Sequence, residues 1–168
     1  NEKRYEFDHL NARLIYDLIL GNKGLLGLSL KAGKFFNAEN IAFMDYKHFN
    51  GNQTHIGQSE RYLNVFNLLP YYSNSTNDSY FELHSEYNDK GYIMNKIPLL
   101  NKLKSTLNLG FHSLSTLTNK PYNEVTVGLD NLGFGKFKIL RIDYVRSYQS
   151  GFKGDGVVFG LKFLNILE

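Results

Sequence analysis

The sequence contains no cysteine and no tryptophan, and only three prolines among 168 residues. Without cysteine, the chain has no disulfide framework, no thiolate nucleophile and no cysteine-ligated zinc or iron–sulfur site. It also has no run of about 18 apolar residues, which excludes a membrane-spanning helix. The 19 Lys and Arg residues and the 16 Asp and Glu residues are spread along the chain without a basic block, so no nucleic-acid partner is indicated.

The abundant residues favour β-structure. Tyr and Phe supply the whole aromatic content of 15%, and there are 15 glycines, a mixture that suits strands and turns. In the last third of the chain, from Tyr122 to Phe163, apolar and polar residues alternate with a period of two in three consecutive segments. The apolar sides of these segments are Val125, Val127 and Leu129; Leu140, Ile142 and Tyr144; and Val157, Phe159, Leu161 and Phe163.

Four earlier segments show the same alternation, at residues 7–20, 26–33, 80–88 and 106–112. Residues 21–24 read Gly-Asn-Lys-Gly and predict a tight hairpin turn, because Gly and Asn adopt positive φ readily. Pro98 has no amide hydrogen to donate, so residues 95–104 are expected to form a turn and not a central strand. The sequence therefore predicts an all-β, antiparallel up-and-down arrangement of about seven to eight strands.

Residues 37–79 break the alternation and are too long for an ordinary connection. We call this segment the excursion. Ser59 is placed to cap a short helix that presents Tyr62, Leu63, Phe66 and Leu69 and ends at Pro70. We expect the excursion to lie outside the cell or to plug the space enclosed by the strands.

The alternation fits two architectures, a soluble β-sandwich and a transmembrane β-barrel, whose strands need about 9–11 residues. The strand ends favour the barrel, because aromatic residues are predicted to cluster at both ends of the strands with aliphatic residues between them. Barrels in a bilayer have such aromatic belts at the two membrane surfaces. Short turns at 21–24 and 131–136 would then lie on one side of the membrane, and longer loops at 37–79 and 149–156 on the other. The two predicted belts are Tyr122, Tyr148 and Phe152; and Tyr87, Tyr92, Phe134, Phe137 and Phe163.

Five motifs are similar to those of a known family. Residues 95–100 read Asn-Lys-Ile-Pro-Leu-Leu and are followed by Lys102, Leu103 and Lys104. The others are Lys-Ala-Gly-Lys-Phe-Phe at 31–36, Asn-Gly-Asn-Gln-Thr at 50–54, Pro-Tyr-Asn-Glu-Val at 121–125 with Val-Gly-Leu-Asp-Asn at 127–131, and Arg-Ile-Asp-Tyr-Val-Arg at 141–146. In their order along the sequence, and over most of the chain, they resemble the C-terminal region of a Bacteroidota outer-membrane barrel family of unknown function. The resemblance implies a transmembrane barrel that follows a carboxypeptidase-regulatory-like domain in full-length members. The chain departs from the family pattern at Phe49, where the family tends to have Pro, and at 58–60, where an acidic pair is usual.

The predicted strand count does not close a barrel. Bacterial single-chain barrels have an even number of strands, from about eight upwards, and an open edge in lipid leaves backbone groups unsatisfied. We therefore expect residues 1–168 to be the C-terminal part of a larger barrel. An additional strand within 42–49 is the alternative. Residues 1–9 are polar and do not form a signal peptide, so a leader has been removed or the chain is a fragment.

Polar side chains on one face of the strands are the candidate site residues. Glu82, His84 and Glu86 alternate along one strand and are within reach of His112 on the next, which allows a metal site or an acid–base pair. A polar barrel interior accounts for the same residues without a site. In such an interior, Arg141 and Asp143 are expected to form an ion pair. No Gly-x-Ser-x-Gly or His-Glu-x-x-His motif occurs, so we expect no catalytic residue, no cofactor and no metal. The predicted lumen-lining residues are Glu82, His84, Glu86, His112, Glu124, Asp130, Arg141, Asp143 and Lys162.

The sequence thus predicts a non-enzymatic protein of the bacterial outer membrane, a structural, assembly or transport component of an envelope complex. Its expected partners are outer-membrane lipid and other envelope proteins. Two alternatives remain open. One is an outer-membrane enzyme that acts on lipid or envelope substrate through Glu82, His84 and Glu86. The other is a soluble lipocalin-like barrel that encloses a lipophilic ligand.

Overall fold

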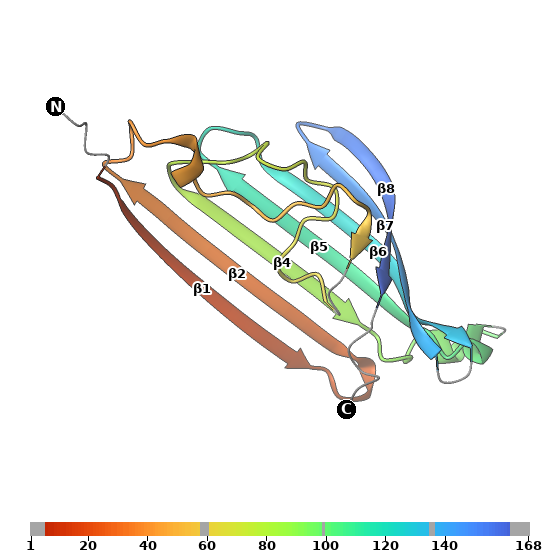
Figure 1. Ribbon diagram of the computed structural model, residues 1–168. Helices are drawn as coiled ribbons and strands as arrows, with labels where there is room; N and C mark the ends of the chain where they lie inside the picture. Colours follow the sequence, from red (N-terminus) through yellow and green to blue (C-terminus); the bar gives the residue numbers. More distant parts are fainter. Residues whose placement is uncertain (1–5, 58–60, 99, 135–136, 162–168) are drawn as a thin grey trace.

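The computed structural model describes residues 6–57, 61–98, 100–134 and 137–161, which form one β-sheet with no α-helix in these ranges (Figure 1). Seven long strands follow the hairpin order of the chain and pair antiparallel. The sheet order is β1-β2-β4-β5-β6-β7-β8-β3. The strands are β1 (Asp8–Ile19), β2 (Leu25–Phe36), β3 (Ile56–Gly57), β4 (Tyr80–Asn88), β5 (Thr106–Thr116), β6 (Tyr122–Phe134), β7 (Phe137–Gln149) and β8 (Phe152–Leu161).

The predicted strands are present, with two corrections to the prediction. The eighth strand is β3, a two-residue segment of the excursion that pairs parallel with β8, whereas residues 42–49 contain the 3-10 turn η2 (Phe43–Asp45) and no strand. The loop expected at 149–156 is shorter, because Ser150 and Gly151 alone form the β7–β8 turn. Their φ angles of 59° and 130° are typical of a tight hairpin turn.

The connection between β4 and β5 is the predicted turn at Pro98. It contains two 3-10 turns, η3 (Met94–Lys96) and η4 (Leu100–Lys102). Asp89 organises its start: the buried carboxylate accepts hydrogen bonds of 2.8–3.1 Å from the backbone N–H groups of Gly91, Ile93, Met94 and Leu107. One side chain thus fixes both ends of this connection.

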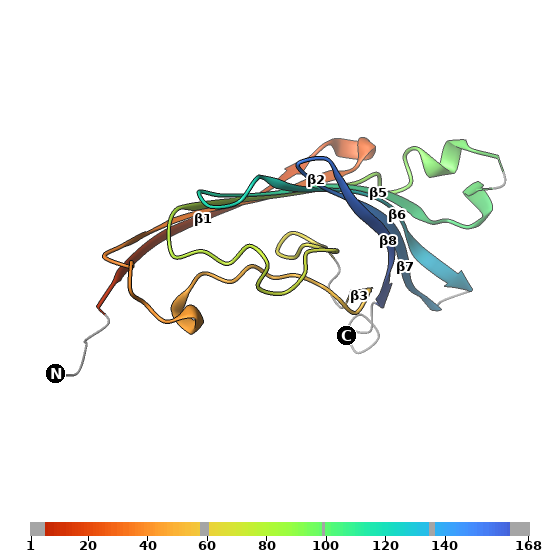
Figure 2. The ribbon, with the colours of Figure 1, turned by 90° about the horizontal axis from the view of Figure 1, so that it is seen from above.

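The two faces of the sheet differ in polarity. The sheet curves as one layer, and the excursion lies across its concave face (Figure 2). Apolar side chains are exposed on the convex face: Leu109 is 40%, Val127 47% and Phe159 51% exposed, and Leu28 is half-buried. Charged side chains are buried on the concave face, where Glu82 and Arg141 are each 1% exposed. The sheet therefore buries its polar face and exposes its apolar face.

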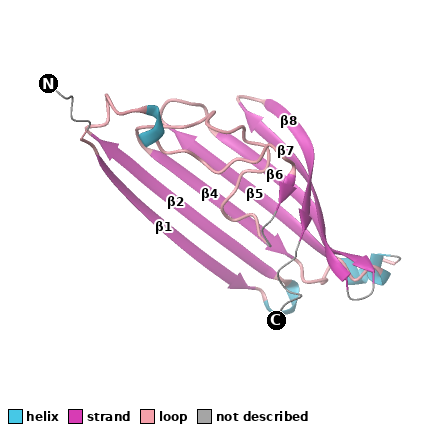
Figure 3. Cartoon of the chain, viewed as in Figure 1, coloured by secondary structure: helices cyan, strands magenta, loops and turns pink. Residues whose placement is uncertain are grey.

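The excursion is mostly irregular, and the short helix predicted at its centre is absent (Figure 3). Ser59, the predicted cap, lies outside the described residues. The expected apolar residues are nevertheless buried, with Tyr62 and Leu69 1% exposed and Phe66 0%. The N–H group of Phe66 donates to the carbonyl of Asn50 at 2.8 Å, and the next two N–H groups donate to a carboxylate on β6. These long-range hydrogen bonds replace the local ones that a helix would need.

The core lies between the excursion and the concave face of the sheet. It combines excursion residues such as Phe49, Phe66 and Leu69 with Tyr80 and Tyr122 from the strands. Tyr122 was predicted in an aromatic belt and is instead 1% exposed, packed against the Phe66 ring at 5.9 Å. The predicted belt members Phe134, Phe137 and Phe163 have side chains outside the described part. No helix among the described residues is long and apolar enough to cross a bilayer.

Candidate functional site

The period of two along each strand positions the candidate site. Alternate residues of a strand lie on one face, so Glu82, His84 and Glu86 of β4 all lie on the concave side, as predicted. The register places His84 directly opposite His112 of β5 and Glu86 opposite Gly110. The excursion covers these residues. Together with other polar side chains of the concave face, they contribute to three separate networks.

The first network joins the two histidines to a carboxylate. The Nδ1 atoms of His84 and His112 are 3.0 Å apart, and His84 Nε2 is 3.4 Å from Glu82 Oε2. Lys31 Nζ lies 3.4 Å from the same oxygen, which gives the buried carboxylate a cationic partner. The Phe66 ring packs over His84 at 4.7 Å between centroids. The excursion therefore covers this network on the side that faces away from the sheet.

The second network is centred on Arg141 of β7, which is fully buried. Its guanidinium contacts Glu86 through Nη1 at 3.2 Å and Nη2 at 2.8 Å, and Asp143 through Nε at 2.7 Å. The predicted ion pair of Arg141 and Asp143 is therefore present, with Glu86 as an additional partner. Tyr62 of the excursion lies over the guanidinium at 4.1 Å, and its N–H donates to Glu86 at 3.2 Å. Burial raises the pKa of the Tyr62 hydroxyl, so the ring remains neutral against the cation.

The third network attaches the excursion to β6 through Glu124. Its two oxygens accept hydrogen bonds from the N–H groups of Asn67 at 2.7 Å and Leu68 at 2.8 Å. The hydroxyl of Tyr122 donates to the same carboxylate at 2.7 Å. The carboxylate is fully buried, and charged acceptors in such positions form strong hydrogen bonds. Glu124 therefore holds the centre of the excursion against the sheet.

Glycines on the concave face provide the space for these contacts. A Cβ atom on Gly128 would lie 1.9 Å from Asp143 Oδ1, and one on Gly160 would lie 2.8 Å from the Tyr62 hydroxyl. On Gly27 of β2 it would lie 2.8 Å from a methyl group of Leu63. The sheet is thus shaped to receive the excursion and the charged side chains beneath it.

The row that the sequence predicted as one unit is divided between two networks. His84 contacts both His112 and Glu82, whereas Glu86 contacts Arg141. Asp130 is 3% exposed on β6, and Lys162 lies outside the described residues. Among the described residues, no group of three or more His, Cys, Asp and Glu side chains is placed to hold a metal ion. The arrangement binds a segment of the same chain, and each carboxylate of the three networks has a partner within its network.

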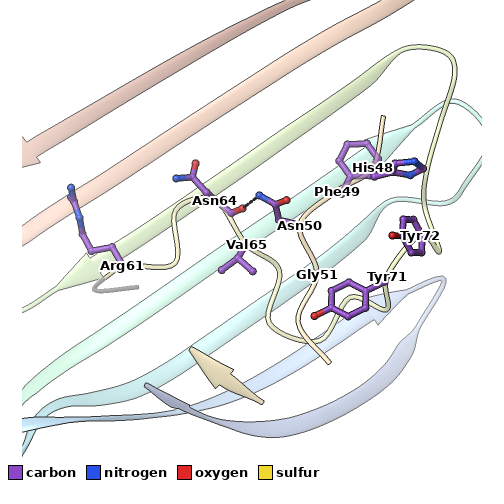
Figure 4. A pocket seen from close by; sticks show the side chains of 9 residues that line it. All are labelled: His48, Phe49, Asn50, Gly51, Arg61, Asn64, Val65, Tyr71 and Tyr72. Atoms are coloured by element: carbon purple, nitrogen blue, oxygen red, sulfur yellow. Dashed lines mark hydrogen bonds between the residues drawn. The ribbon is translucent and has the colours of Figure 1, made fainter. Parts of the chain in front are cut away.

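Sequence reasoning missed a pocket formed by the excursion alone. Its volume is about 480 Å³, and its walls come from residues 48–51, from Arg61, Asn64 and Val65, and from Tyr71 and Tyr72 (Figure 4). A neighbouring cavity of about 410 Å³ shares Gly51, Val65 and Tyr71 with it. The sequence signal for this pocket is the abundance of Asn, His and Tyr in the excursion, which identifies no individual residue.

Comparison with known proteins gives one match. No curated protein and no solved structure matches the chain. The model of a family of unknown function, the DUF5686 C-terminal domain, matches residues 1–129. The match extends from β1 into β6 and includes the whole excursion, together with Glu82, His84, Glu86, His112 and Glu124. Since the match covers more than half of the sequence, the chain belongs to the DUF5686 family and represents its C-terminal domain.

Proposed function

We propose that this chain is the C-terminal part of a bacterial outer-membrane β-barrel whose lumen is filled by the excursion. In this proposal the protein is a structural, assembly or transport component of an envelope complex. The observation that carries the proposal is the polarity of the sheet, which exposes Val127 and Phe159 on its convex face and buries Glu82 and Arg141 on its concave face. A transmembrane barrel has this polarity, because its outer surface contacts hydrocarbon and its interior is polar.

The edges of the sheet support additional strands. β1 lies at one edge, and residues on both of its faces are exposed, for example Leu14 at 60% and Ile15 at 51%. At the other edge, β3 consists of only two residues, Ile56 and Gly57, which pair with β8. Unpaired backbone groups are costly in lipid. Strands from elsewhere in a longer protein would satisfy both edges, and a match to a C-terminal domain fits such an arrangement.

Contacts between the excursion and three of the strands support a resident plug. The excursion is attached to three different strands, through Glu86 of β4, Glu124 of β6 and Asp17 of β1. The Asp17 carboxylate pairs with Arg61 of the excursion at 2.7 Å. The Bacteroidota origin and the upstream regulatory-like domain come from the motif resemblance and belong to the same proposal. We do not propose an enzyme, because Glu82, His84 and Glu86 lie beneath the excursion, without access for a substrate.

Fractionation of cells that produce the full-length protein tests the proposal. We expect the protein in the outer-membrane fraction after alkaline carbonate extraction, and recovery in the supernatant only when detergent is added. A protein that stays in the supernatant without detergent would support a soluble barrel instead.

A charged substitution tests the lipid-facing assignment directly. Val127→Arg introduces a cation in the middle of β6, which is expected to lower the free energy of unfolding in lipid vesicles by about 2–4 kcal/mol. Leu117→Arg is the matched control, because Leu117 is 69% exposed in the β5–β6 connection, outside the predicted bilayer. Equal effects of the two substitutions would contradict a membrane contact at Val127.

A further inference from the structure

The excursion pocket has the properties of a preformed binding site. Its volume of about 480 Å³, and the neighbouring one of about 410 Å³, both lie within the range of about 300–1,000 Å³ that is typical of small-molecule sites. The two cavities share Tyr71, Val65 and Gly51, so they adjoin each other at these residues. Their walls belong to the excursion, which includes the two-residue strand β3, and not to the seven long strands. This inference is therefore independent of the proposed barrel.

Hydrogen bonds across the excursion hold the walls of the pocket in place. Asn50 Nδ2 donates to the carbonyl of Asn64 at 3.1 Å (Figure 4), and Lys47 and Thr76 exchange two backbone hydrogen bonds. Gly51 lies so close to the opposite limb that a Cβ atom would be 2.1 Å from the carbonyl oxygen of Leu69. A site whose walls are already fixed loses little conformational entropy when a ligand binds.

Aromatic rings are presented at the rim of the pocket. Tyr71 is 48% and Tyr72 62% exposed, and neither hydroxyl has a hydrogen-bond partner among the described residues. Tyr72 has a φ of 65°, a conformation that is rare for an aromatic residue and that occurs preferentially at functional positions. The ring of His48 packs edge-on against Tyr72 at 4.9 Å, and its Nδ1 lies 2.7 Å from the Ser75 hydroxyl. The exposed Tyr72 ring is therefore packed against the His48 ring on one side.

The charge of the pocket restricts the ligand. In the described part of the chain, Arg61 is the one permanently charged side chain that lines either cavity, and both of its Nη atoms contact Asp17, at 2.7 and 3.2 Å. The other polar side chains in the walls are His48, Asn50, Asn52, Thr54, Tyr62, Asn64, Tyr71 and Tyr72. The buried Asn52 amide is already bonded to Ile56 and Thr54, and Asn64 Oδ1 accepts from Arg13. The exposed Asn50 amide, the Asn64 NH₂ group and the Tyr71 and Tyr72 hydroxyls therefore supply the donors and acceptors for a ligand. Such a set fits a neutral ligand that carries many hydroxyl groups.

We propose that the pocket between residues 48–52, 61–65 and 71–72 binds a neutral oligosaccharide, with the Tyr71 and Tyr72 rings against the C–H faces of two sugar units. The electron-rich face of a phenol ring attracts weakly positive C–H groups. The exposed Asn50 and Asn64 side chains then pair with sugar hydroxyls, which can both donate and accept hydrogen bonds. Two adjoining cavities around Tyr71 match an extended ligand better than a single compact one.

Calorimetry and saturation-transfer NMR test this proposal with the full-length protein. The protein is held in a zwitterionic detergent without a sugar head group, and the probes are maltohexaose, cellohexaose, mannohexaose and the hexamer of N-acetylglucosamine. We expect at least one hexasaccharide to bind with a measurable dissociation constant. We also expect the Tyr71→Ala/Tyr72→Ala double variant to weaken that binding at least tenfold.

The controls separate the pocket from the rest of the molecule. Tyr16→Ala removes an equally exposed tyrosine from β1, 56% exposed, and is expected to leave sugar binding unchanged. An uncharged capped oligoglycine of similar length tests the competing class of ligand. The proposal is overturned if no hexasaccharide binds, if the double variant binds as tightly as the unmodified protein, or if the peptide alone binds. Circular dichroism confirms that the double variant remains folded, since both side chains are exposed.

Discussion

Arg141 on β7 and Glu86 on β4 form a bidentate ion pair, with Nη2 to Oε2 at 2.8 Å, although β5 and β6 lie between the two strands. Two glycines explain how the side chains meet. Gly110 lies opposite Glu86 on β5, and Gly128 lies opposite Asp143 on β6, so no side chain from either position fills the space between the charges. The Arg141–Glu86 pair therefore depends on residues that make no polar contact themselves.

Gly128→Ala is expected to disturb this network. The new Cβ would lie 1.9 Å from Asp143 Oδ1, so the carboxylate has to move away from Arg141. We expect the free energy of unfolding to fall by about 1–3 kcal/mol, as for other insertions into a packed interior. Urea titration in detergent micelles measures it. Gly154→Ala is the control, because a Cβ there meets only the Ser147 hydroxyl at 4.0 Å, and it should have little effect.

Arg141→Met is expected to be more destabilising. It leaves the carboxylates of Glu86 and Asp143 buried without a cation, which costs about 3–5 kcal/mol. Arg146→Met, at an exposed position of the same strand, should cost less than about 1 kcal/mol. Neutralising the two acids as well, with Glu86→Gln and Asp143→Asn, should restore at least half of the loss. The charge network would be irrelevant to stability if Arg141→Met and Arg146→Met had equal effects.

The strands were predictable because alternation is a local property of the sequence. Glu82, His84 and Glu86 were correctly placed on one face, and the Pro98 turn follows from the missing amide hydrogen. The prediction for Tyr122 was wrong because the alternation was not applied to it. It lies two residues before Glu124, so the period of two places it on the concave face, where it is found, and not in a belt at the membrane surface.

The path of the excursion was not predictable from local patterns. The spacing of Tyr62, Phe66 and Leu69 resembles a helix face, but all three are buried against strands distant in sequence. The partner of the Asn67 and Leu68 N–H groups is Glu124, more than fifty residues away. A two-residue strand such as β3 likewise has no sequence pattern of its own, because its position is set by β8. The pocket could not be predicted for the same reason, since its walls meet only after the excursion has folded.

Glu124→Gln is expected to loosen the excursion while leaving the strands paired. The glutamine retains one acceptor oxygen, and its NH₂ group faces N–H donors where the second oxygen had been. We expect the opening of the excursion to become about 1–3 kcal/mol easier, which corresponds to amide exchange at Phe66–Leu69 that is faster by roughly 5–150-fold. Hydrogen exchange with mass spectrometry measures it. Glu39→Gln, at an exposed position of the same excursion, serves as the control, and equal exchange in the two variants would show that Glu124 does not anchor this segment.

Asp89 gives the β4–β5 connection a defined pH dependence. Burial raises the pKa of this carboxyl. The four backbone N–H groups that donate to it together lower the pKa by more than burial raises it, so the pKa lies below its ordinary value. A carboxyl of this kind stabilises the fold fully above its unfolded pKa of about 3.9, and the contribution is lost as the pH falls through the folded pKa. We expect Asp89→Asn to lower the free energy of unfolding by about 1–3 kcal/mol at neutral pH, with a difference from the unmodified protein that shrinks below about pH 4. Unfolding titrations between neutral and acidic pH measure this difference, with Asp45→Asn as the control at an exposed carboxylate. A difference that stays constant through the acidic range would show that the charge of Asp89 is not what stabilises the turn.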